Sequence, residues 1–351
     1  MQEFEKGSAL LRGLSSMVKV YLAPGNSDDE IFVSLRKTAR EVLHYRSWKS
    51  AVLDWAKNEG GDLAVVVAHQ IKALDLFVTT GRNTALCPQV MGILNVTPDS
   101  FSDGGAHLDT AAALRHGQQM VNDGATILDI GGESTRPGSD AVPLDTELAR
   151  VSPVIEGCRN LGVRISIDTR KKDLMAAAVA AGATLINDVS ALEYDPESLP
   201  FVAESGLPVC LMHSAADPKI MQDNPDYDHV VFDVIDYLGA RIAACEAAGI
   251  PRNRIIVDPG IGFGKTVEHN LALIKGLPYF HALGCDVLLG ASRKGFIGKL
   301  TGVPVAADRI AGSIAVALHG AEAGVHILRV HDVAETCQAV QIWHSIKTAS
   351  F

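Results

Sequence analysis

The stretch TILDIGGESTR, residues 126–136, joins a short apolar run to a series of glycine and polar residues. An apolar run of this length is too short for a typical helix and suits a strand that is buried on both faces. The polar residues after it need partners if they are buried, because an unpaired polar group in an apolar interior is costly. The stretch therefore predicts a buried strand that ends at a polar edge.

Similar apolar runs recur through the rest of the chain, and helical patterns separate them. Parallel strands joined by helical crossovers explain this alternation. Eight such units over residues 89–351 suit a closed (β/α)8 barrel, a TIM barrel, whose usual size is roughly 250 residues. The predicted strands are Val90–Val96, Thr126–Ile130, Arg164–Ile167, Thr184–Asn187, Pro208–Met212, Arg254–Val257, Asp286–Leu289 and Val325–Val330. The predicted helices include Ala111–Asn122, Glu147–Asn160, Leu174–Ala181, Val230–Ala247 and Ala306–Ala321.

An open, doubly wound α/β sheet is the structural alternative to the barrel. It would normally have fewer strands and a glycine-rich turn after the first one. Here the first strand leads into NVTPD, residues 95–99, which is no dinucleotide-binding fingerprint. We therefore predict a barrel domain over residues 73–351.

Residues 1–72 lack this strand–helix rhythm and carry no recognisable chemistry. Residues 29–46 are expected to form a helix, since Ile31, Leu35, Ala39 and Val42 recur at helical spacing. A second helix is expected over residues 48–58, ended by two glycines. We predict a mainly helical N-terminal extension of unknown role.

The composition narrows the function. The chain has 351 residues and a formal net charge of -10, so a basic face for nucleic acid is not expected. The most apolar stretch, Leu63–Val78, is interrupted by polar and charged residues and is not expected to span a membrane. The six cysteines form no C-x-x-C pair, and the N-terminus resembles no secretory signal. These features indicate reduced thiols and a cytoplasmic location.

The predicted strands share one further property, because polar residues stand at their carboxyl ends. In a barrel these ends meet at one mouth, where the active sites of this fold lie. Capping of local backbone explains any single one of these residues, but it does not easily explain polar residues after all eight strands. The residues are Asn95, Asp129, Asp168, Asn187, Asp188, His213, Asp258, Ser292, Arg293, Lys294, Arg329 and His331.

Two chemistries are present at this mouth. Carboxylate and amide groups suit the donor-rich edge of a flat heterocycle, and a lysine adds a donor for a carbonyl or ring nitrogen. Arginine and histidine suit a phosphate or diphosphate, although salt bridges to neighbouring carboxylates are the alternative for them. Asp129, Asp188 and Thr169 are the residues best explained as orienting their neighbours.

Two other site classes are not supported. The sequence GFGKT, residues 262–266, ends like a phosphate-binding P-loop, but Pro259 stands where that motif needs glycine. No dense set of His, Cys and carboxylate ligands predicts a transition-metal site. A magnesium ion held mainly by the phosphates of a ligand remains compatible with the sequence.

Two long motifs begin within the first two predicted strands, MGILNVTPDSFSDGG at residues 91–105 and DIGGESTRPG at residues 129–138. They resemble the first two signatures of the dihydropteroate synthase family, and the resemblance covers about residues 88–351. The strand ends SIDTRK, INDVS, LMH, DPGIGFGKT, GASRKGFIG and RVHDV follow in the family order. The resemblance implies a (β/α)8 enzyme that condenses 6-hydroxymethyl-7,8-dihydropterin diphosphate with 4-aminobenzoate, uses Mg²⁺, and is inhibited by sulfonamides as competitors. It also implies a homodimer.

The resemblance implies a role for individual residues. Asp168, Lys294 and Asn95 would take part in catalysis, and Asn95 would bind the metal and the diphosphate. The pterin would contact Asp168, Asn187, Met212, Asp258 and Lys294, and the diphosphate would also contact Thr135, Arg136, Arg329 and His331. The aminobenzoate would contact Phe101, Thr135, Pro137, Phe263 and Ser292. After His213 the chain departs from the common family pattern, since Ser214-Ala215-Ala216 follows.

Two alternatives of other classes remain open at this stage. A corrinoid-dependent methyltransferase that uses a methylated folate would keep the pterin residues but has no use for the two long signatures. A pterin-binding protein without catalysis should have lost signature residues such as Phe101, Thr135 and Arg136, which are all present.

Overall fold

The computed structural model describes residues 2–3, 19–77, 87–97, 106–133, 142–214 and 225–350. The chain divides into two compact units. The larger unit consists of Cys87–Pro225, Tyr237–Ile274 and Cys285–Phe351. The smaller one consists of Met1–Leu86 together with Asp226–Asp236 and Lys275–Gly284.

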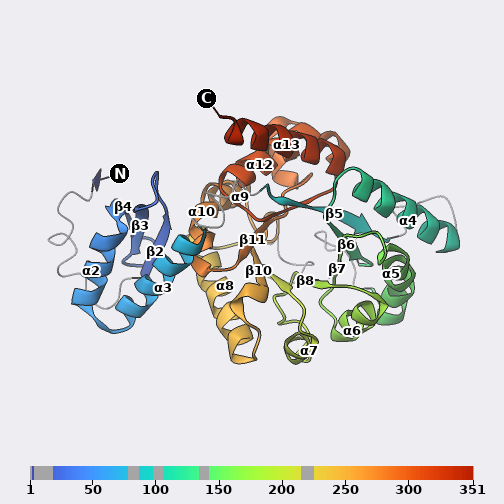
Figure 1. Ribbon diagram of the computed structural model, residues 1–351, viewed down its shortest axis with the longest axis horizontal. Helices are drawn as coiled ribbons and strands as arrows, with labels where there is room; N and C mark the ends of the chain where they lie inside the picture. The colour runs from blue at the N-terminus through green and yellow to red at the C-terminus, as the bar shows by residue number, and fades with distance from the viewer. Residues whose placement is uncertain are drawn as a thin grey trace. The chain divides into compact units, whose positions relative to one another are not determined.

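The larger unit contains a closed barrel of parallel strands in the order β10-β11-β12-β5-β6-β7-β8-β9 (Figure 1). All eight predicted strands are confirmed, with bounds that differ by at most two residues. The strands are β5 (Gln89–Asn95), β6 (Ile127–Gly131), β7 (Arg164–Asp168), β8 (Leu185–Asp188), β9 (Val209–Met212), β10 (Ile255–Asp258), β11 (Asp286–Leu289) and β12 (Ile327–Val330).

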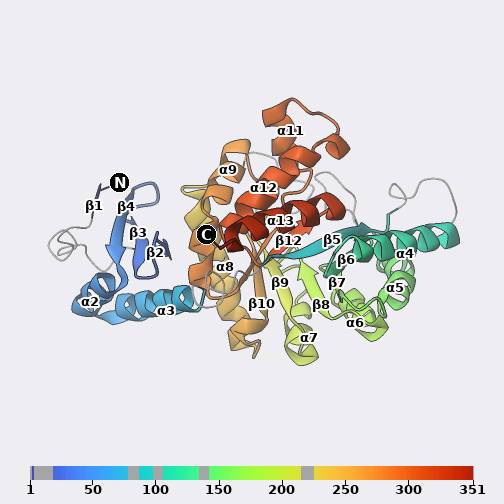
Figure 2. The same ribbon diagram turned by 45° about the horizontal axis from the view of Figure 1, so that its top comes forward.

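Helices follow the strands and lie on the outside of the barrel (Figures 1 and 2). They include α4 (Ala106–Asn122), α5 (Leu144–Cys158), α6 (Lys172–Ala181), α7 (Ser198–Ser205), α8 (Val230–Ala247), α9 (Val267–Lys275), α11 (Gly295–Thr301), α12 (Ile310–Glu322) and α13 (Val333–Thr348). Short 3₁₀ helices occur at η3 (Arg252–Arg254) and η5 (Ala306–Asp308). Among the described helices, none has the length and apolar character needed to cross a membrane.

A layer of apolar side chains fills the barrel. Seven of the eight strands contribute one residue each to this buried cluster, which consists of Met91, Ile127, Leu185, Cys210, Ile256, Leu288 and Ile327. Side chains from strands all around a barrel can meet only in its interior. The layer lies on the amino-terminal side of the polar strand ends, so it forms an apolar floor beneath them.

The smaller unit is built on a four-stranded sheet, and the expected helix over residues 29–46 is wrong. The sheet has the order β1-β4-β3-β2, with β1 (Gln2–Glu3), β2 (Lys19–Pro24), β3 (Glu30–Arg36) and β4 (Val42–Trp48). Strands β3 and β4 form an antiparallel pair. In β3 the fully buried apolar side chains are Ile31, Val33 and Leu35, which alternate along the strand. Ile31 and Leu35 fit a helical spacing equally well, and for this reason a helix was predicted where the structure has a strand.

Two helices complete the N-terminal part of this unit. The expected second helix is confirmed as α2 (Lys49–Glu59), which ends at Gly60 with a φ of 74°. The longer α3 (Gly61–Phe77) buries Val67, Ile71 and Leu74 in a core shared with the sheet. The extension is therefore a small antiparallel sheet with two helices, and it is not mainly helical.

The segments 226–236 and 275–284 contribute the start of α8, α10 (Leu277–Phe280) and η4 (His281–Leu283) to the same unit. Arg36 of β3 forms an ion pair with Asp233 at 2.6 Å, and Tyr21 of β2 donates a hydrogen bond to Asp236. The Ser34 hydroxyl lies 2.8 Å from the hydroxyl of Tyr279. Polar contacts thus join the sheet to parts of the chain about two hundred residues later.

Strand β2 forms one end of the sheet, and the side chain of Gln70 covers its backbone. Gln70 Oε1 accepts a hydrogen bond from Leu22 N at 2.9 Å, and Gln70 Nε2 donates one to Val20 O at 2.8 Å. Two backbone groups that the sheet leaves unpaired are satisfied in this way.

Candidate active site

The predicted pterin residues lie together at the carboxyl ends of adjacent strands. Asp168 ends β7 and stands opposite Asn187 of β8, and Met212 ends β9 opposite Asp258 of β10. These four side chains are between 3% and 7% exposed, whereas Asn95 at the end of β5 is only half-buried. Strand pairing therefore brings these residues to one end of the barrel, as predicted.

Arg329 of β12 is engaged with two carboxylates. Its Nε donates to Asp129 Oδ2 at 2.6 Å, and its Nη2 donates to Asp168 Oδ2 at 2.7 Å. The sequence left two readings of this arginine open, a diphosphate ligand and a salt bridge. The salt bridge is present, and it places the guanidinium directly beside the predicted pterin site.

The charges at this point influence one another strongly. Burial raises the pKa of Asp168, the Arg329 guanidinium opposes this effect, and the neighbouring carboxylates of Asp129 and Asp188 add to it. Burial lowers the pKa of Arg329, but Asp129 and Asp168 outweigh that effect and the net pKa is raised. Arg329 is therefore cationic, and the pKa of Asp168 is raised above its ordinary value despite the neighbouring guanidinium.

Asp129 acts on both sides of the site. Its Oδ2 also accepts a hydrogen bond from Asn187 Nδ2 at 3.0 Å, so one carboxylate oxygen holds an amide and a guanidinium. Among the described residues, Asp129 Oδ1 and Asp168 Oδ1 are buried and have no hydrogen-bond partner. Buried acceptors of this kind are costly unless a ligand supplies donors.

The turn after β10 brings its backbone very close to the neighbouring strand end. Gly260 N donates to Asp258 Oδ1 at 2.7 Å, and a Cβ on Gly260 would lie 1.9 Å from the carbonyl oxygen of His213. Gly260 also has a φ of 69°, which side chains rarely adopt. The glycine is thus required for the approach that fixes Asp258.

Lys294 and Phe263 lie in contact, although the resemblance assigns them to different substrates. Lys294 Nζ lies 4.0 Å from the centre of the Phe263 ring, within the range of a cation–π contact. Burial raises the pKa of Asp258, while the hydrogen bond from Gly260 and the charge of Lys294 lower it. Lys294 is therefore close enough to act on the predicted pterin carboxylate.

Ser292 and His331 are also brought together. Ser292 Oγ lies 3.1 Å from His331 Nδ1 and accepts a hydrogen bond from His331 N at 3.1 Å. Burial lowers the pKa of His331 to about 3, and the charges of Arg329 and Arg293 contribute. The adjacent carboxylate of Asp332 raises the pKa of His331, but it is paired with Arg293 and does not outweigh the other effects.

Lys265 was missed by the sequence reasoning, which treated it only as part of a failed P-loop. The side chain is 4% exposed and donates to Phe263 O at 2.8 Å, and its Nζ lies 3.0 Å from His213 Nδ1. Burial lowers the pKa of Lys265 to about 7. The available signal was its place in a strand-end loop beside an apolar run, where a lysine must be buried or paired.

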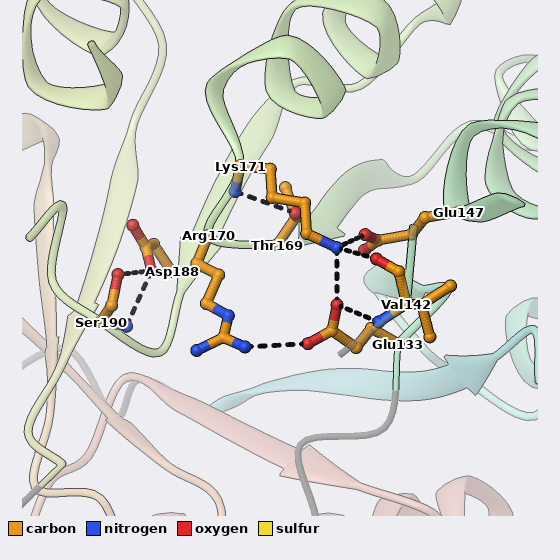
Figure 3. A network of polar contacts seen from close by, with 8 residues as sticks. All are labelled: Glu133, Val142, Glu147, Thr169, Arg170, Lys171, Asp188 and Ser190. Atoms are coloured by element: carbon orange, nitrogen blue, oxygen red, sulfur yellow. Dashed lines mark hydrogen bonds and ion pairs between the residues drawn. The ribbon is translucent and has the colours of Figure 1, made fainter. Parts of the chain in front are cut away.

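A second polar network, which the sequence did not reveal, lies beside the end of β7 (Figure 3). Lys171 Nζ donates to Glu133 Oε2 at 2.7 Å and to Glu147 Oε2 at 2.6 Å. Glu147 is 1% exposed and precedes Val151 by four residues on the buried side of α5. Its position on that apolar stripe was the signal for a buried, paired carboxylate.

Asp188 has the orienting role that the sequence suggested. Its Oδ1 accepts hydrogen bonds from Ser190 N at 2.7 Å and Ser190 Oγ at 2.6 Å, and its Oδ2 accepts one from Leu192 N at 3.0 Å. Ala191 and Leu192 have φ values of 53° and 62°. The carboxylate therefore holds a turn that is unfavourable for these residue types.

Four predicted site residues fall outside the described residues. They are Phe101, Thr135, Arg136 and Pro137. Their assignments stay predictions.

Known proteins with similar sequences and structures belong to a family of pterin-binding enzymes. The family profile described as "Pterin binding enzyme" matches residues 91–331. The dihydropteroate synthase of Escherichia coli strain K12 is 48% identical over 256 residues, which cover 73% of this chain and 90% of that protein.

Two solved structures are similar in fold and sequence. Xanthomonas albilineans dihydropteroate synthase with 4-aminobenzoic acid has a TM-score of 0.72 and 49% identity, and the match covers 76% of this chain and 95% of that one. Yersinia pestis dihydropteroate synthase in a sulfonamide drug complex has a TM-score of 0.71 and 47% identity, with coverage of 75% and 95%.

Proposed function

The chain belongs to the dihydropteroate synthase family of pterin-binding enzymes, which acts in folate biosynthesis, and we propose how its described residues carry out the reaction. The substrates are 6-hydroxymethyl-7,8-dihydropterin diphosphate and 4-aminobenzoate, and the products are 7,8-dihydropteroate and diphosphate. The reaction takes place at the carboxyl ends of the barrel strands.

The observation that carries this proposal is the pair of buried carboxylate oxygens without partners. Asp129 Oδ1 and Asp168 Oδ1 lack donors among the described residues. Asn187 lies on β8, next to the strand of Asp168, and Asp258 lies on β10, on the other side of β9. The guanidine-like edge of a pterin offers several N–H donors on one flat face, which would satisfy such acceptors. Met212 is buried at the same level and would pack against the ring.

Arg329 and His331 would bind the diphosphate of the substrate. Arg329 lies near the end of β12, and His331 is the first residue after that strand. The guanidinium of Arg329 is cationic in the buried site. Arginine can make two parallel hydrogen bonds to phosphate oxygens. We propose that Arg329 shares its charge between Asp168 and the diphosphate, and that His331 donates from its ring.

A magnesium ion fits this site only in combination with the diphosphate. Among the described residues, no group of three or more His, Cys, Asp or Glu side chains is placed to hold a metal. Asn95 Oδ1 borders Gly131, since a Cβ on that glycine would lie 3.8 Å from it. An amide oxygen is a ligand of the type that Mg²⁺ prefers. We propose Asn95 as the protein ligand; the bound ion would neutralise charge on the leaving diphosphate.

The described residues lower the barrier by electrostatics. As the C–O bond to the diphosphate breaks, positive charge develops on the methylene carbon and spreads into the pterin. The ionised form of Asp168 stabilises this charge, and Lys294 holds the pterin through a carbonyl or ring nitrogen. Preorganised charges of this kind can supply several kcal/mol of transition-state stabilisation.

The second substrate needs little chemical help. The amine of 4-aminobenzoate is a weak base, and attack on a cation needs no strong general base. We propose that Phe263 and Ser292 border this substrate, together with the predicted residues Phe101, Thr135 and Pro137. Sulfonamides would compete at the same place.

The location and assembly of the protein are also proposals. Six free cysteines, of which Cys158, Cys210, Cys245 and Cys285 are buried, suit the reducing cytoplasm. A homodimer is supported by exposed apolar side chains on α13, since Ile342 is 59% and Ile346 72% exposed. The mass in solution, measured by light scattering, tests the dimer.

The direct test of the function is product formation. Purified protein is incubated with the pterin diphosphate and 4-aminobenzoate, with and without Mg²⁺ and with a sulfonamide. We expect dihydropteroate only with Mg²⁺, and less of it with the sulfonamide. No product from a folded protein under any of these conditions would refute the proposal.

A further inference from the structure

Arg293, which stands between two predicted substrate residues, has an unfavourable backbone conformation. Its φ is 57°, a left-handed value that residues other than glycine rarely adopt. Lys294 N donates to Ala291 O at 3.4 Å, so Arg293 is the third residue of a four-residue turn that follows β11. Glycine is the usual residue at this place when φ is positive. Backbone strain of this kind persists only where surrounding contacts impose it, and it is concentrated at functional sites.

Contacts from the start of α12 hold the backbone of Arg293. Arg293 N donates to Ser313 Oγ at 2.9 Å, and Nη1 of Arg309, the residue before α12, donates to Arg293 O at 2.9 Å. Ser313 Oγ also donates to Arg309 O at 2.8 Å. The three residues therefore form a closed ring of hydrogen bonds, in which both backbone polar groups of Arg293 are paired.

The side chain of Arg293 is held from another direction. Its Nε donates to Asp332 Oδ2 at 3.0 Å, and its Nη2 also pairs with Asp332. Asp332 is 7% exposed and stands directly before α13, where its backbone oxygen accepts a hydrogen bond from Thr336 Oγ1 at 2.6 Å. Two parallel hydrogen bonds to a carboxylate fix the plane of a guanidinium. A glycine in this position would relieve the strain but would lose this pairing.

The residues on either side of Arg293 make contacts within the predicted substrate site. Ser292 Oγ lies 3.1 Å from His331 Nδ1. Lys294 Nζ lies 4.0 Å from the centre of the Phe263 ring. Because Ser292 and Lys294 flank the left-handed residue, a change of its φ to an ordinary negative value rotates one of them relative to the other. The conformation of Arg293 thus sets the relative directions of two side chains at the barrel mouth.

We propose that Ser313 is a positioning residue for both substrates: it fixes the turn at Arg293 and thereby the directions of the two side chains that flank this turn. The inference rests on the proposed function, which assigns Ser292 to the aminobenzoate and Lys294 to the pterin. Ser313 is 7% exposed and lies on α12, not at a strand end. Its hydroxyl suits the task, because one hydroxyl can accept from the amide of Arg293 while it donates to a carbonyl oxygen.

The test compares Ser313→Ala with Ser345→Ala. Ser345 is a matched control, since it is exposed and its hydroxyl donates to the oxygen of Gln341, four residues earlier on α13, as that of Ser313 does to Arg309 O. We expect Ser313→Ala to raise the dissociation constant of the pterin diphosphate and the KM for 4-aminobenzoate by about three- to tenfold each. This is the range for the loss of one intramolecular hydrogen bond. Ser345→Ala should match the wild type in both measurements.

Inorganic diphosphate serves as the control ligand. Arg329, one of its proposed partners, is held by Asp129 and Asp168 and not by the turn. The dissociation constant of inorganic diphosphate, measured by calorimetry, should therefore change less than about twofold in Ser313→Ala. An equal loss of affinity for diphosphate and for both substrates would mean that the whole mouth is disturbed, and it would overturn the proposal.

Two further variants distinguish positioning from a loss of stability. Ser313→Thr keeps a hydroxyl and should restore both constants, and a loss as large as in Ser313→Ala would contradict the role of the hydroxyl. Asp332→Asn weakens the hold on the Arg293 side chain and should raise the same two constants by about twofold or more, as expected for a weaker hydrogen bond. If Ser313→Ala does not fold, Asp332→Asn decides. Unchanged constants in the folded variant overturn the proposal in either case.

Hydrogen exchange separates this inference from the proposed function. Peptides that cover residues 290–297 contain the amide of Arg293, which donates to Ser313 Oγ. We expect faster exchange there in Ser313→Ala, but not in Ser313→Thr or Ser345→Ala. This readout needs no turnover, so faster exchange together with a wild type that forms no dihydropteroate refutes the proposed function and leaves the role of Ser313 at the turn in place. Unchanged exchange in Ser313→Ala overturns that role.

Discussion

Arg329 Nη2 lies 2.7 Å from Asp168 Oδ2 and thereby joins the predicted diphosphate residue to the predicted pterin residue. The same guanidinium contacts Asp129 through Nε. One cation therefore faces two carboxylates, and in the proposed mechanism this is where the leaving group separates from the developing cation. This arrangement suits a ligand that brings N–H donors to the carboxylates and an anion to the arginine.

Asp168→Asn tests the electrostatic role of the carboxylate. The change keeps the shape of the side chain but removes its negative charge. We expect kcat to fall by about a hundredfold or more, in the range seen when one preorganised group is removed. Binding of inorganic diphosphate should persist or tighten, because Arg329 loses one competing carboxylate. Kinetics and calorimetry give these two results, and Asp173→Asn, an exposed site on α6, is the control. Near-normal turnover of Asp168→Asn contradicts the assignment.

Arg329→Met tests the cation between the two aspartates. Asp129 and Asp168 would then face each other without a compensating charge, which should cost about 3–5 kcal/mol of unfolding free energy. The double variant Arg329→Met/Asp129→Asn removes one of the two charges and should recover part of that loss. Diphosphate binding should be lost in both variants. If the double variant binds diphosphate as well as the wild type does, Arg329 is only a structural partner of the carboxylates.

His331→Gln tests a pH effect. The pKa of His331 is lowered from 6.5 to about 3, mainly by burial and then by the charge of Arg329. Between these values the unfolded chain binds a proton that the folded chain does not. The contribution of His331 to stability is therefore complete above about pH 6.5 and is lost as the pH falls toward 3. From pH 7 to pH 4, we expect the variant to lose about 1–3 kcal/mol less unfolding free energy than the wild type does.

The comparison with the variant is necessary because other groups act in the opposite direction. Burial raises the pKa of Asp188 to about 6, so the folded chain binds the extra proton there, and stability from this group is lost as the pH rises. Urea unfolding at several pH values measures the difference, with His319→Gln on an exposed face of α12 as the control. Parallel pH curves for the wild type and His331→Gln would rule out a buried neutral histidine.

Gly260→Ala tests the close approach that fixes Asp258. The added Cβ would lie 1.9 Å from His213 O, and the φ of 69° is also unfavourable. Gly206→Ala is a matched control, since Gly206 has a φ of 73° but nothing within 4 Å of the added Cβ. We expect about 1–2 kcal/mol of destabilisation at Gly206 from backbone strain alone, and clearly more at Gly260. Chemical unfolding measures both values, and equal losses would refute the steric role.

Much of the barrel and its mouth could be predicted because two independent patterns coincide. The buried strands are apolar runs, and each run is followed by polar residues. Asp168, Asn187 and Asp258 are examples, and all three are buried. Chain order alone then places these residues at one end of the barrel. The relatives are named dihydropteroate synthases, which favours that reading over the methyltransferase and the non-catalytic protein.

Pairings between side chains could not be predicted in the same way. The distance in sequence between Arg329 and Asp129 is 200 residues, and no local pattern distinguishes a salt bridge from a phosphate ligand. The prediction of a helix in place of the N-terminal sheet was wrong for a different reason. Ile31 and Leu35 satisfy both a period of 2 and a helical period, and Lys37–Arg40 carry none of the usual turn residues between strands.

The side-chain amide of Gln70 affects whether the edge strand β2 can pair with a strand of another protein. A strand at the end of a sheet can recruit a foreign strand and so start aggregation. By bonding to Leu22 N and Val20 O, the carboxamide imitates the backbone of an additional strand without offering a further edge. One side chain of α3 thus occupies two hydrogen-bonding groups of β2, so a foreign strand cannot pair with them.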